Sequence, residues 1–161
     1  MKYITVAKDY KAIVDDEDFD YLNTYKWALN KGYAVAKLCN RSNFLQMHKF
    51  IMYYPKSMTI DHINQNKLDN RKSNLRVCTQ LQNNYNKPRQ RNNKSGYKGV
   101  WWNKKTQKWQ AAITENRKRH QLGRFEYKNQ AAMAYNKAAL KYHGEFAYLN
   151  EITQKDFVLP S

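Results

Sequence analysis

The sequence contains few of the residues that several common kinds of site require. Its 161 residues include only two cysteines and five glycines. Cys39 and Cys78 lack the C-x-x-C spacing of a zinc site, so we expect no zinc and two reduced thiols, with a disulfide as the less favoured alternative. The glycines form neither a phosphate loop nor a dinucleotide fingerprint, and no serine or cysteine stands in a nucleophile motif. The motifs of those enzyme classes are therefore missing.

Long apolar segments are also missing. No apolar run reaches about 18 residues and there is no amphipathic basic helix, so we expect no membrane partner. The first segment, MKYITVAKDYKAIVDDEDFD, lacks the apolar core of a signal peptide. We therefore expect a cytoplasmic protein.

Acidic residues are scarce beside basic ones. The chain has 29 Lys and Arg against 13 Asp and Glu, a formal net charge of +16. Such a surplus gains free energy by displacing counterions from nucleic-acid phosphates. Residues 87–128 contain thirteen of the basic residues and only two acidic ones, whereas residues 1–30 contain six acidic residues and four lysines. We place the nucleic-acid surface in residues 87–128, with an inert basic surface as the alternative.

Short strands and helices are expected along the whole chain. β-Branched and aromatic residues predict the strands, and Pro55 and Gly144 are expected to end helices. Thr79 is the expected N-cap of the second helix, and the acidic run at 15–18 is expected to be a solvated loop. The strands are predicted at 3–6, 12–14, 33–38, 58–63, 74–78, 97–103, 108–114 and 117–125, and the helices at 47–54, 79–87 and 129–143.

Composition divides the chain into two modules. The segment KPRQRNNKSG at 87–96 has the proline, glycine and charge of a linker. We predict a first module over residues 1–86, a basic linker over 87–96, a second module over 97–151 and a tail over 152–161. The fold class is α+β: a β-rich segment followed by a strand–strand–helix unit, and then a three-stranded antiparallel sheet packed on one helix.

Three residues of the first module form a candidate metal site. Asp61 and His62 are adjacent at the end of a predicted strand, and Asn83 lies on the helix that follows. A hard cation such as Mg²⁺ takes oxygen ligands, which Asp61 and the amide of Asn83 can supply. His62 can accept a proton from an attacking water near neutral pH. Because neighbours on a strand point to opposite faces, both can reach one phosphate only if the strand ends or bends at this pair.

The segments MHKFIM and TIDHINQNKLDNRKSNLRVCTQLQNN, within residues 45–87, resemble the HNH endonucleases of phages and mobile introns, homing-type enzymes with a ββα-metal site. The resemblance implies that Asp61 and Asn83 bind Mg²⁺ or Mn²⁺, that His62 is the general base, and that Asn74 orients it. Many members have His at the position of Asn83, whereas the subgroup with the DHIN and NLR pattern has Asn. A phage-encoded chain would act in the host cytoplasm.

Four further polar residues are not assigned to the active site. His48, on a predicted helix upstream, is assigned a structural role, and Asn70 is assigned to a turn. His120 and His143 lack carboxylate partners in the sequence pattern, so we expect them to face solvent or to pack.

Alternation along the last three strands separates a packing face from a polar face. The packing face contains Val100, Trp102, Trp109, Ala111, Ile113 and Leu122. We expect Trp27, Trp102 and Trp109 in the core and Trp101 to be more open. The opposite face carries Trp101, Asn103, Lys108, Gln110, Ala112, Thr114, Arg119 and Gln121. Its amide and cationic groups suit base edges and phosphates.

The segments YKGVWW, KWQAAI, LGRF, AAMAYNKAAL and HGEFAYLN, over about 97–150, resemble the APETALA2/ERF-type DNA-binding domain. That family lays a three-stranded sheet into the major groove. By position, the resemblance implies DNA contacts from Lys98, Trp101, Asn103, Lys108, Thr114, Arg119 and Gln121. Several of these are Arg or Trp in plant members. The resemblance therefore predicts the fold of this segment but not the DNA sequence that it prefers.

Together these features predict a metal-dependent DNA endonuclease that a C-terminal sheet targets to double-stranded DNA. Mg²⁺ or Mn²⁺ is the expected cofactor, and a homodimer is expected if both strands are cut. A non-catalytic DNA-binding regulator is the first alternative. An RNA-binding protein is the second, for which exposed ring platforms would be expected.

Overall fold

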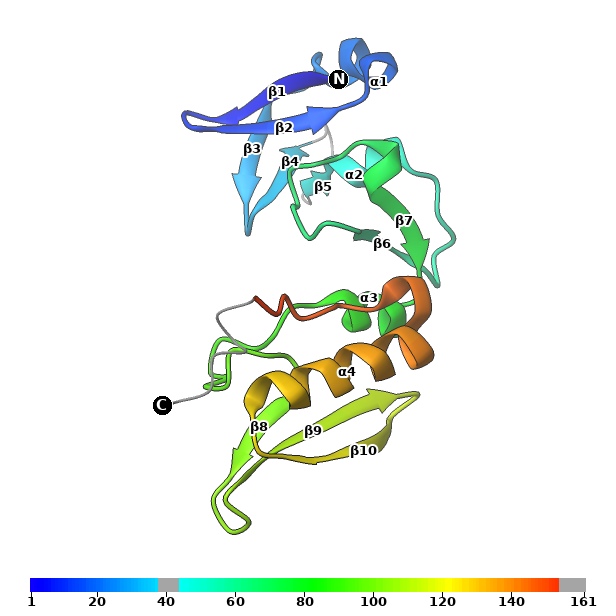
Figure 1. The fold of residues 1–161 in the computed structure, drawn as a ribbon. Helices are drawn as coiled ribbons and strands as arrows, with labels where there is room; N and C mark the ends of the chain where they lie inside the picture. The colour runs from blue at the N-terminus through cyan, green and yellow to red at the C-terminus, as the bar shows by residue number, and fades with distance from the viewer. Residues whose placement is uncertain (38–43, 154–161) are drawn as a thin grey trace. The chain divides into compact units, whose positions relative to one another are not determined.

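A computed structural model describes residues 1–37 and 44–153 of the chain (Figure 1). The chain divides into two compact units, Met1–Asn83 and Asn84–Ser161, and each is described by itself. Both mix small antiparallel sheets with helices, as expected of an α+β protein. Cys39, the last residue of the strand predicted at 33–38 and most of the predicted tail lie outside the described residues. The predicted domain boundaries stay predictions.

The first unit contains three small antiparallel sheets. One sheet pairs β1 (Lys2–Ala7) with β2 (Tyr10–Val14), the second contains β3 (Trp27–Asn30), β4 (Tyr33–Lys37) and β5 (Phe44–Gln46), and the third pairs β6 (Thr59–His62) with β7 (Leu75–Cys78). The first unit also contains the helices α1 (Asp16–Leu22) and α2 (Met47–Ile51) and a 3₁₀ turn, η1, over Lys72–Asn74. Helix α3 (Gln80–Asn86) begins in this unit and ends in the second one. β3, β5 and α1 are additions to the predicted strands and α-helices.

The loop predicted at residues 15–18 is wrong, because these residues begin helix α1. Asp15 occupies the N-cap position in extended conformation, and Asp16, Glu17 and Asp18 fill the first turn. Negative charge is favourable there, since the N-terminal end of a helix carries partial positive charge. An acidic run before an amphipathic segment is thus a helix-start signal as well as a loop signal.

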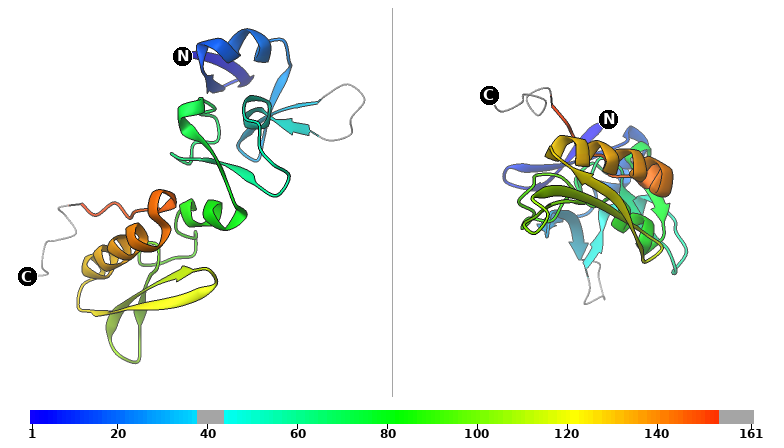
Figure 2. Two further views of the ribbon diagram at one scale, coloured as in Figure 1. Left: turned by 90° about the vertical axis from the view of Figure 1, so that its right-hand side faces the viewer. Right: turned by 60° about the horizontal axis from the view of Figure 1, so that its bottom comes forward.

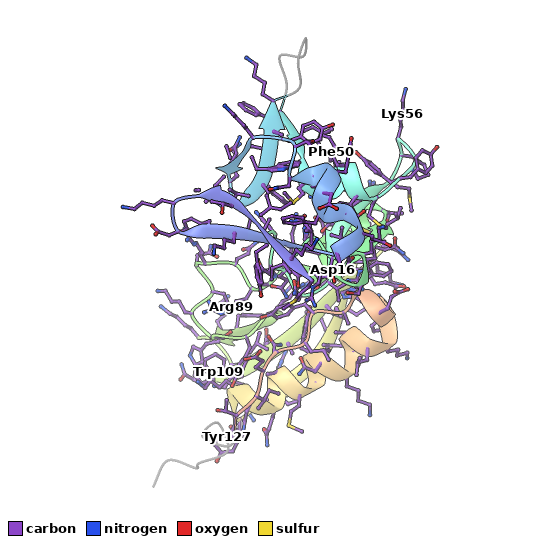
Figure 3. All side chains as sticks on the ribbon, turned by 90° about the horizontal axis from the view of Figure 1, so that it is seen from above. Asp16, Phe50, Lys56, Arg89, Trp109 and Tyr127 are labelled. Atoms are coloured by element: carbon purple, nitrogen blue, oxygen red, sulfur yellow. The ribbon has the colours of Figure 1, made fainter. Side chains whose placement is uncertain are left out.

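The N-terminal hairpin and α2 share one hydrophobic core. It contains Ile4, Val6, Ala12, Val14, Leu22, Trp27, Ala34, Ala36 and Met47, with Leu68 packed against it. Trp27 is buried, as predicted, and its indole N–H donates to the carbonyl of Leu22 at 2.7 Å. Phe50 of α2, which is labelled in Figure 3, packs edge-on against the Trp27 ring. The two ring centroids are 5.3 Å apart. The β-rich segment therefore shares one core with α2.

The predicted N-cap of α3 is confirmed. The side-chain oxygen of Thr79 accepts the backbone N–H of Gln82 at 3.1 Å, and the Gln82 side chain accepts the N–H of Thr79 at 2.8 Å. This reciprocal arrangement is a capping box, which satisfies two backbone donors at the helix start.

The second unit is a three-stranded antiparallel sheet with one long helix across one face (Figures 1 and 2). Its strands are β8 (Val100–Asn103), β9 (Lys108–Glu115) and β10 (Lys118–Phe125), in the order β10-β9-β8, followed by α4 (Lys128–His143) and the 3₁₀ turn η2 (Gly144–Phe146). Gly144 is the C-cap of α4, as predicted. A Cβ at Gly99 would lie 2.2 Å from the ring of Tyr135, so glycine is what lets the chain approach the helix closely.

The end of the predicted linker is folded rather than extended. The side-chain oxygen of Asn93 accepts from the N–H groups of Ser95 and Gly96, and the Ser95 hydroxyl donates to the carbonyl of Val100 at 2.9 Å. Residues 93–96 therefore belong to the second unit's hydrogen-bond network. Among the described residues, no helix has the length and apolar character needed to cross a membrane.

Candidate active site and nucleic-acid interface

The β6–β7 hairpin places Asp61 and His62 at the end of a strand. In its register Asp61 lies opposite Arg76 and His62 opposite Leu75, and β6 ends at His62. The strand end that this adjacent pair requires is therefore present. Only 6% of Asp61 and 5% of His62 is exposed, so both side chains lie in a largely dehydrated environment.

Asp61 forms a buried ion pair across the hairpin. The Nε and Nη2 atoms of Arg76 donate to its Oδ2 at 3.0 and 2.7 Å. A partner of this kind offsets the cost of burying a carboxylate. Arg76 lies in the NLR motif, but its pairing with Asp61 becomes visible only from the register of the hairpin.

The face of the hairpin that carries Asp61 is turned toward the start of α3. Thr59 lies opposite Cys78 two positions along, so Cys78 shares this face with Asp61. Burial, with the charge of Asp61, raises the pKa of the Cys78 thiol to about 11, and the backbone N–H of Asn83 hydrogen-bonds that thiol. Cys78 is thus the buried, reduced thiol that was predicted. Asn83 is half-buried on the helix that follows β7.

His62 occupies the other face of the hairpin, among aromatic rings. Its Nε2 lies 3.4 Å from Oδ1 of Asn70, and its ring centroid lies 5.0 Å from that of His48 and 6.0 Å from that of Tyr33. Burial, outweighing the hydrogen bond to Asn70 and the charge of Asp61, lowers the pKa of His62. The imidazole is therefore neutral at pH 7, which is the form that accepts a proton.

His48 packs against His62 and is itself almost completely buried. Burial, together with the charges of His62 and Lys49, lowers the pKa of His48 to about 3. A ring that stays neutral and packs edge-on against His62 fits the structural role assigned to His48. The sequence pattern gave no sign that it packs directly on the candidate base.

The side chains of the two loop asparagines contact different groups. The Asn74 amide accepts the N–H of Asn64 at 3.0 Å and donates to the carbonyl of Asp69 at 2.8 Å, so it ties the loop together. The side chain that contacts His62 belongs to Asn70. Asn70 is only 1% exposed and lies outside a turn. The assignment of Asn70 to a turn is therefore corrected.

The donor set of this site consists mainly of oxygen. Among residues 1–37 and 44–153, no three His, Cys, Asp or Glu side chains gather where they could hold a metal ion. A cation at Asp61 would have to complete its shell with amide, water or phosphate oxygens, which is the preference of Mg²⁺. The residues present fit such an ion.

The second unit presents the predicted polar face opposite α4. Arg119 of β10 and Trp101 of β8 meet on it, with the guanidinium 4.8 Å from the ring centroid. Thr114, Arg119 and Gln121 are exposed, and the small side chain of Ala112 lies between the two outer strands. A cation stacked on a ring presents both charge and a flat apolar surface, and nucleic-acid interfaces use both.

Two further polar residues of this face, Asn103 and Lys108, take part in local contacts. The side-chain oxygen of Asn103 accepts the N–H of Lys105 at 2.9 Å, within the β8–β9 turn. The ammonium of Lys108 pairs with Glu126 at 2.6 Å on the surface. An exposed ion pair of this kind exchanges easily for a phosphate contact.

Two residues of the second unit depart from their predicted places. Trp102 was expected in the core and is 39% exposed, although it packs edge-on against Trp109 at 5.2 Å. Lys98 was expected to contact DNA, and its ammonium instead donates to the carbonyls of Tyr85 and Lys87 at 2.7 and 2.6 Å. Burial, followed by the charge of Lys87, lowers the pKa of Lys98 to about 8. Lys98 therefore caps the C-terminal end of α3.

His120 and His143 pack on aromatic rings, one of the two roles expected for them. The His120 ring stacks on Tyr142 with 4.7 Å between centroids. His143 stacks on Tyr85 at 3.7 Å and its Nε2 lies 2.9 Å from the carbonyl of Thr114. Both histidines therefore stabilise the second unit.

Lys98 and Arg119 form a matched pair of variants for testing the polar face. Arg119→Ala should raise the dissociation constant for DNA about 10-fold and reduce its salt dependence, because a cation of the interface is removed. Lys98→Ala should leave the salt dependence unchanged and lower the free energy of unfolding by about 1–3 kcal/mol, because the carbonyls of Tyr85 and Lys87 lose a charged donor. Fluorescence anisotropy across a salt series and thermal unfolding measure these effects. Equal salt dependence in wild type and Arg119→Ala would contradict the assignment.

Comparisons with known proteins follow the same division of the chain. Residues 52–85 match the model of an HNH endonuclease family, and residues 95–145 match the AP2 domain. An uncharacterized HNH endonuclease of Acanthamoeba polyphaga mimivirus is 34% identical over 148 residues, which cover 88% of this chain and 75% of that protein. Protein 3.8 of Escherichia phage T7 is 32% identical over 93 residues, covering 58% of this chain and 76% of the phage protein. No solved structure matches the chain.

Proposed function

The chain belongs to the HNH endonuclease family and carries an AP2 DNA-binding domain, and on this basis we propose that it is a metal-dependent DNA endonuclease targeted by the AP2 sheet. One observation carries the proposal: Asp61 and His62 stand at the end of β6 with different partners on the two faces of the hairpin. This separation suits two tasks, metal binding and proton transfer.

Asp61 and Asn83 would hold Mg²⁺ or Mn²⁺ in a ββα-metal arrangement formed by β6, β7 and α3. When bound, the metal would stabilise negative charge on the phosphate that is attacked and on the leaving oxygen. Asp61 supplies a carboxylate that already binds a cationic group, Arg76, through Oδ2. Asn83 supplies an amide oxygen from the adjacent helix.

His62 would take the proton of the attacking water. Because Oδ1 of Asn70 can only accept a hydrogen bond, we assign the ring proton of His62 to Nε2 and the lone pair to Nδ1. Nδ1 accepts a proton as the water oxygen bonds to phosphorus, and the bond from phosphorus to the departing sugar oxygen breaks. The departing sugar oxygen takes a proton from solvent water, so the products are a phosphate end and a hydroxyl end. Asn74 supports this geometry by tying the loop from Asn64 to Asp69 rather than by touching the base.

The AP2 sheet would determine where on the DNA the protein binds. Its face around Trp101 and Arg119 contains both stacking and hydrogen-bonding groups for double-stranded DNA. A centre formed by Asp61, His62 and Asn83 would attack one phosphate at a time. Cutting both strands would then require a homodimer or two successive events.

Metal removal tests this function. Supercoiled plasmid incubated with the full chain and Mg²⁺ should convert to nicked or linear DNA, and an excess of EDTA should stop the conversion. Readdition of Mg²⁺ or Mn²⁺ should restore it. Conversion that continues at the same rate in EDTA would refute metal dependence, and no conversion at any metal concentration would refute the nuclease proposal.

A further inference from the structure

The loop between β6 and β7 contains four asparagines, of which three bind the loop's own backbone. These bonds join Asn64 to Asn66, Asn66 to Leu68, and Asn74 to Asn64 and Asp69. Asn70 differs from the other three. Its side chain meets His62 instead, with Oδ1 3.4 Å from Nε2.

The Asn70 amide is buried in a way that the stability of the loop does not explain. The residue is 1% exposed, and among the described residues its Nδ2 has no hydrogen-bond partner. Leaving a buried amide donor unsatisfied costs about 1–3 kcal/mol. A polar side chain kept under such conditions beside a candidate base indicates a functional role. Its long hydrogen bond to His62 is of the kind that tightens when substrate binds.

We propose that Asn70 is a positioning residue for His62 and that the N-terminal β1–β2 hairpin holds Asn70 in place. Oδ1 fixes the Nε2–H tautomer and the rotation of the ring, so that Nδ1 presents its lone pair to the water. This inference rests on the proposed role of His62 as the general base. It also assigns a task to the β-rich segment that precedes the nuclease motif.

The hairpin holds the residues around Asn70 by backbone hydrogen bonds. The N–H of Ile13 in β2 donates to the carbonyl of Leu68 at 2.7 Å, and the N–H of Asn70 donates to the carbonyl of Ile13 at 2.8 Å. Ile13 and Asp69 thereby form a parallel bridge. The backbone of Asn70 is fixed from a segment more than fifty residues earlier in the chain.

A second set of contacts holds Lys72, which follows Asn70 closely in the chain. The carboxylate of Asp15 accepts the N–H of Lys72 at 2.7 Å, and the ammonium of Lys72 pairs with Glu17 and with Asp18. The acidic start of α1 therefore binds the segment that follows Asn70.

A third contact holds the loop from inside. The Asp69 carboxylate, which is almost fully buried, accepts from Arg71 at 2.8 and 2.6 Å and from the amide of Asn64 at 2.9 Å. The hydrogen bonds that Arg71 donates hold the pKa of Asp69 below its usual value, against the effect of burial. The residue next to Asn70 is thus immobilised from both sides, which is what a positioning side chain requires.

Two variants of Asn70 separate positioning from packing. Asn70→Leu removes the acceptor at nearly constant volume, whereas Asn70→Asp keeps an acceptor oxygen. We expect Asn70→Leu to lower kcat of plasmid cleavage about 10- to 100-fold with the DNA dissociation constant unchanged, and Asn70→Asp to retain most of the rate. A role in packing alone would give the opposite order, because Leu suits a buried site better than Asp.

The tautomer of His62 is a readout that does not depend on activity. Long-range ¹H–¹⁵N spectra of the wild-type imidazole should show the Nε2–H form, and Asn70→Leu should shift it toward Nδ1–H. A wild-type ring in the Nδ1–H form would overturn the proposal even if the Leu variant failed to fold. Failure of the proposed function can be told apart from failure of the Asn70 proposal. If the chain is not a nuclease, the wild type will not cleave DNA, whichever tautomer His62 adopts. Wild-type cleavage with an equally active Asn70→Leu variant would refute the role of Asn70 alone.

The contribution of the hairpin side is tested by two aspartates. Asp15→Ala removes the acceptor for the Lys72 N–H. Asp20→Ala removes a carboxylate of α1 that is 90% exposed and pairs with Lys2 rather than with the segment around Asn70. Asp15→Ala should lower kcat and broaden the His62 ring signals, while Asp20→Ala should change neither. If both variants have the same kcat and the same His62 signal widths, the contact between Asp15 and Lys72 does not help to position Asn70.

Discussion

Asp61→Asn is expected to reduce Mg²⁺-dependent cleavage of plasmid DNA by about 10²- to 10⁴-fold, because metal stabilisation of the transition state contributes several kcal/mol. Asparagine keeps the shape of the side chain and one oxygen, but it loses the charge that attracts a divalent cation. The same change weakens the partner of Arg76, whose side chain is 12% exposed. We therefore also expect the free energy of unfolding to fall, by about 1–3 kcal/mol. Cleavage rates over a Mg²⁺ series and Mn²⁺ binding followed by electron paramagnetic resonance measure the first effect.

Asp69→Asn is the matched control for this variant. Asp69 is also buried and also paired with an arginine, Arg71, so its replacement brings a comparable loss of stability. It is not a proposed metal ligand, and its variant should bind Mn²⁺ as the wild type does. Loss of Mn²⁺ binding in both variants, or in neither, would contradict the assignment of Asp61.

His62→Ala is expected to lower the rate of cleavage by about 10²- to 10⁴-fold, which is the usual contribution of a positioned general base. DNA affinity should not change, because His62 is 5% exposed and the proposed DNA-reading groups lie on the AP2 sheet. Mn²⁺ binding should also remain, since the metal ligands are on the other face of the hairpin. Single-turnover conversion of plasmid and a gel-shift assay separate the two steps.

His120→Ala serves as the control for His62→Ala. His120 stacks on Tyr142 in the second unit and has no proposed part in proton transfer. Its variant should cleave at nearly the wild-type rate once protein stability is accounted for by thermal unfolding. A drop as large as that of His62→Ala would mean that neither histidine has a specific role.

Local chemistry made several elements predictable from the sequence. The capping box at Thr79 and Gln82 uses residues three positions apart, so it is visible without tertiary information. The polar face of the second sheet follows from alternation, which the cation–π contact between Trp101 and Arg119 reflects. These features depend on neighbours in the sequence or on a fixed period.

Other features depend on contacts that no local pattern encodes. Lys98 matches the position of a DNA contact in its family, but its long side chain reaches two carbonyls at the end of α3. Trp102 has the alternation of a core residue, but it lies where packing is incomplete. In both cases the surroundings of the side chain, rather than its place in the strand, determine its role.

The candidate site shows the same limit. Asp61 and His62 stand out because their spacing to Asn74 and Asn83 matches a family pattern. Asn70 does not stand out, since its burial depends on Ile13, which pairs with Asp69 from the distant N-terminal hairpin. A buried amide that acts on a neighbour is recognised only when the fold shows which neighbour it meets.

The most direct test of the account is the conversion of supercoiled plasmid in Mg²⁺ by wild type and by His62→Ala, at protein concentrations that shift all of the DNA in a gel. We predict that nicked or linear DNA accumulates with the wild type and that almost none forms with the variant over the same time. Equal conversion by the two proteins, or none by either, would contradict a cutting centre at Asp61 and His62.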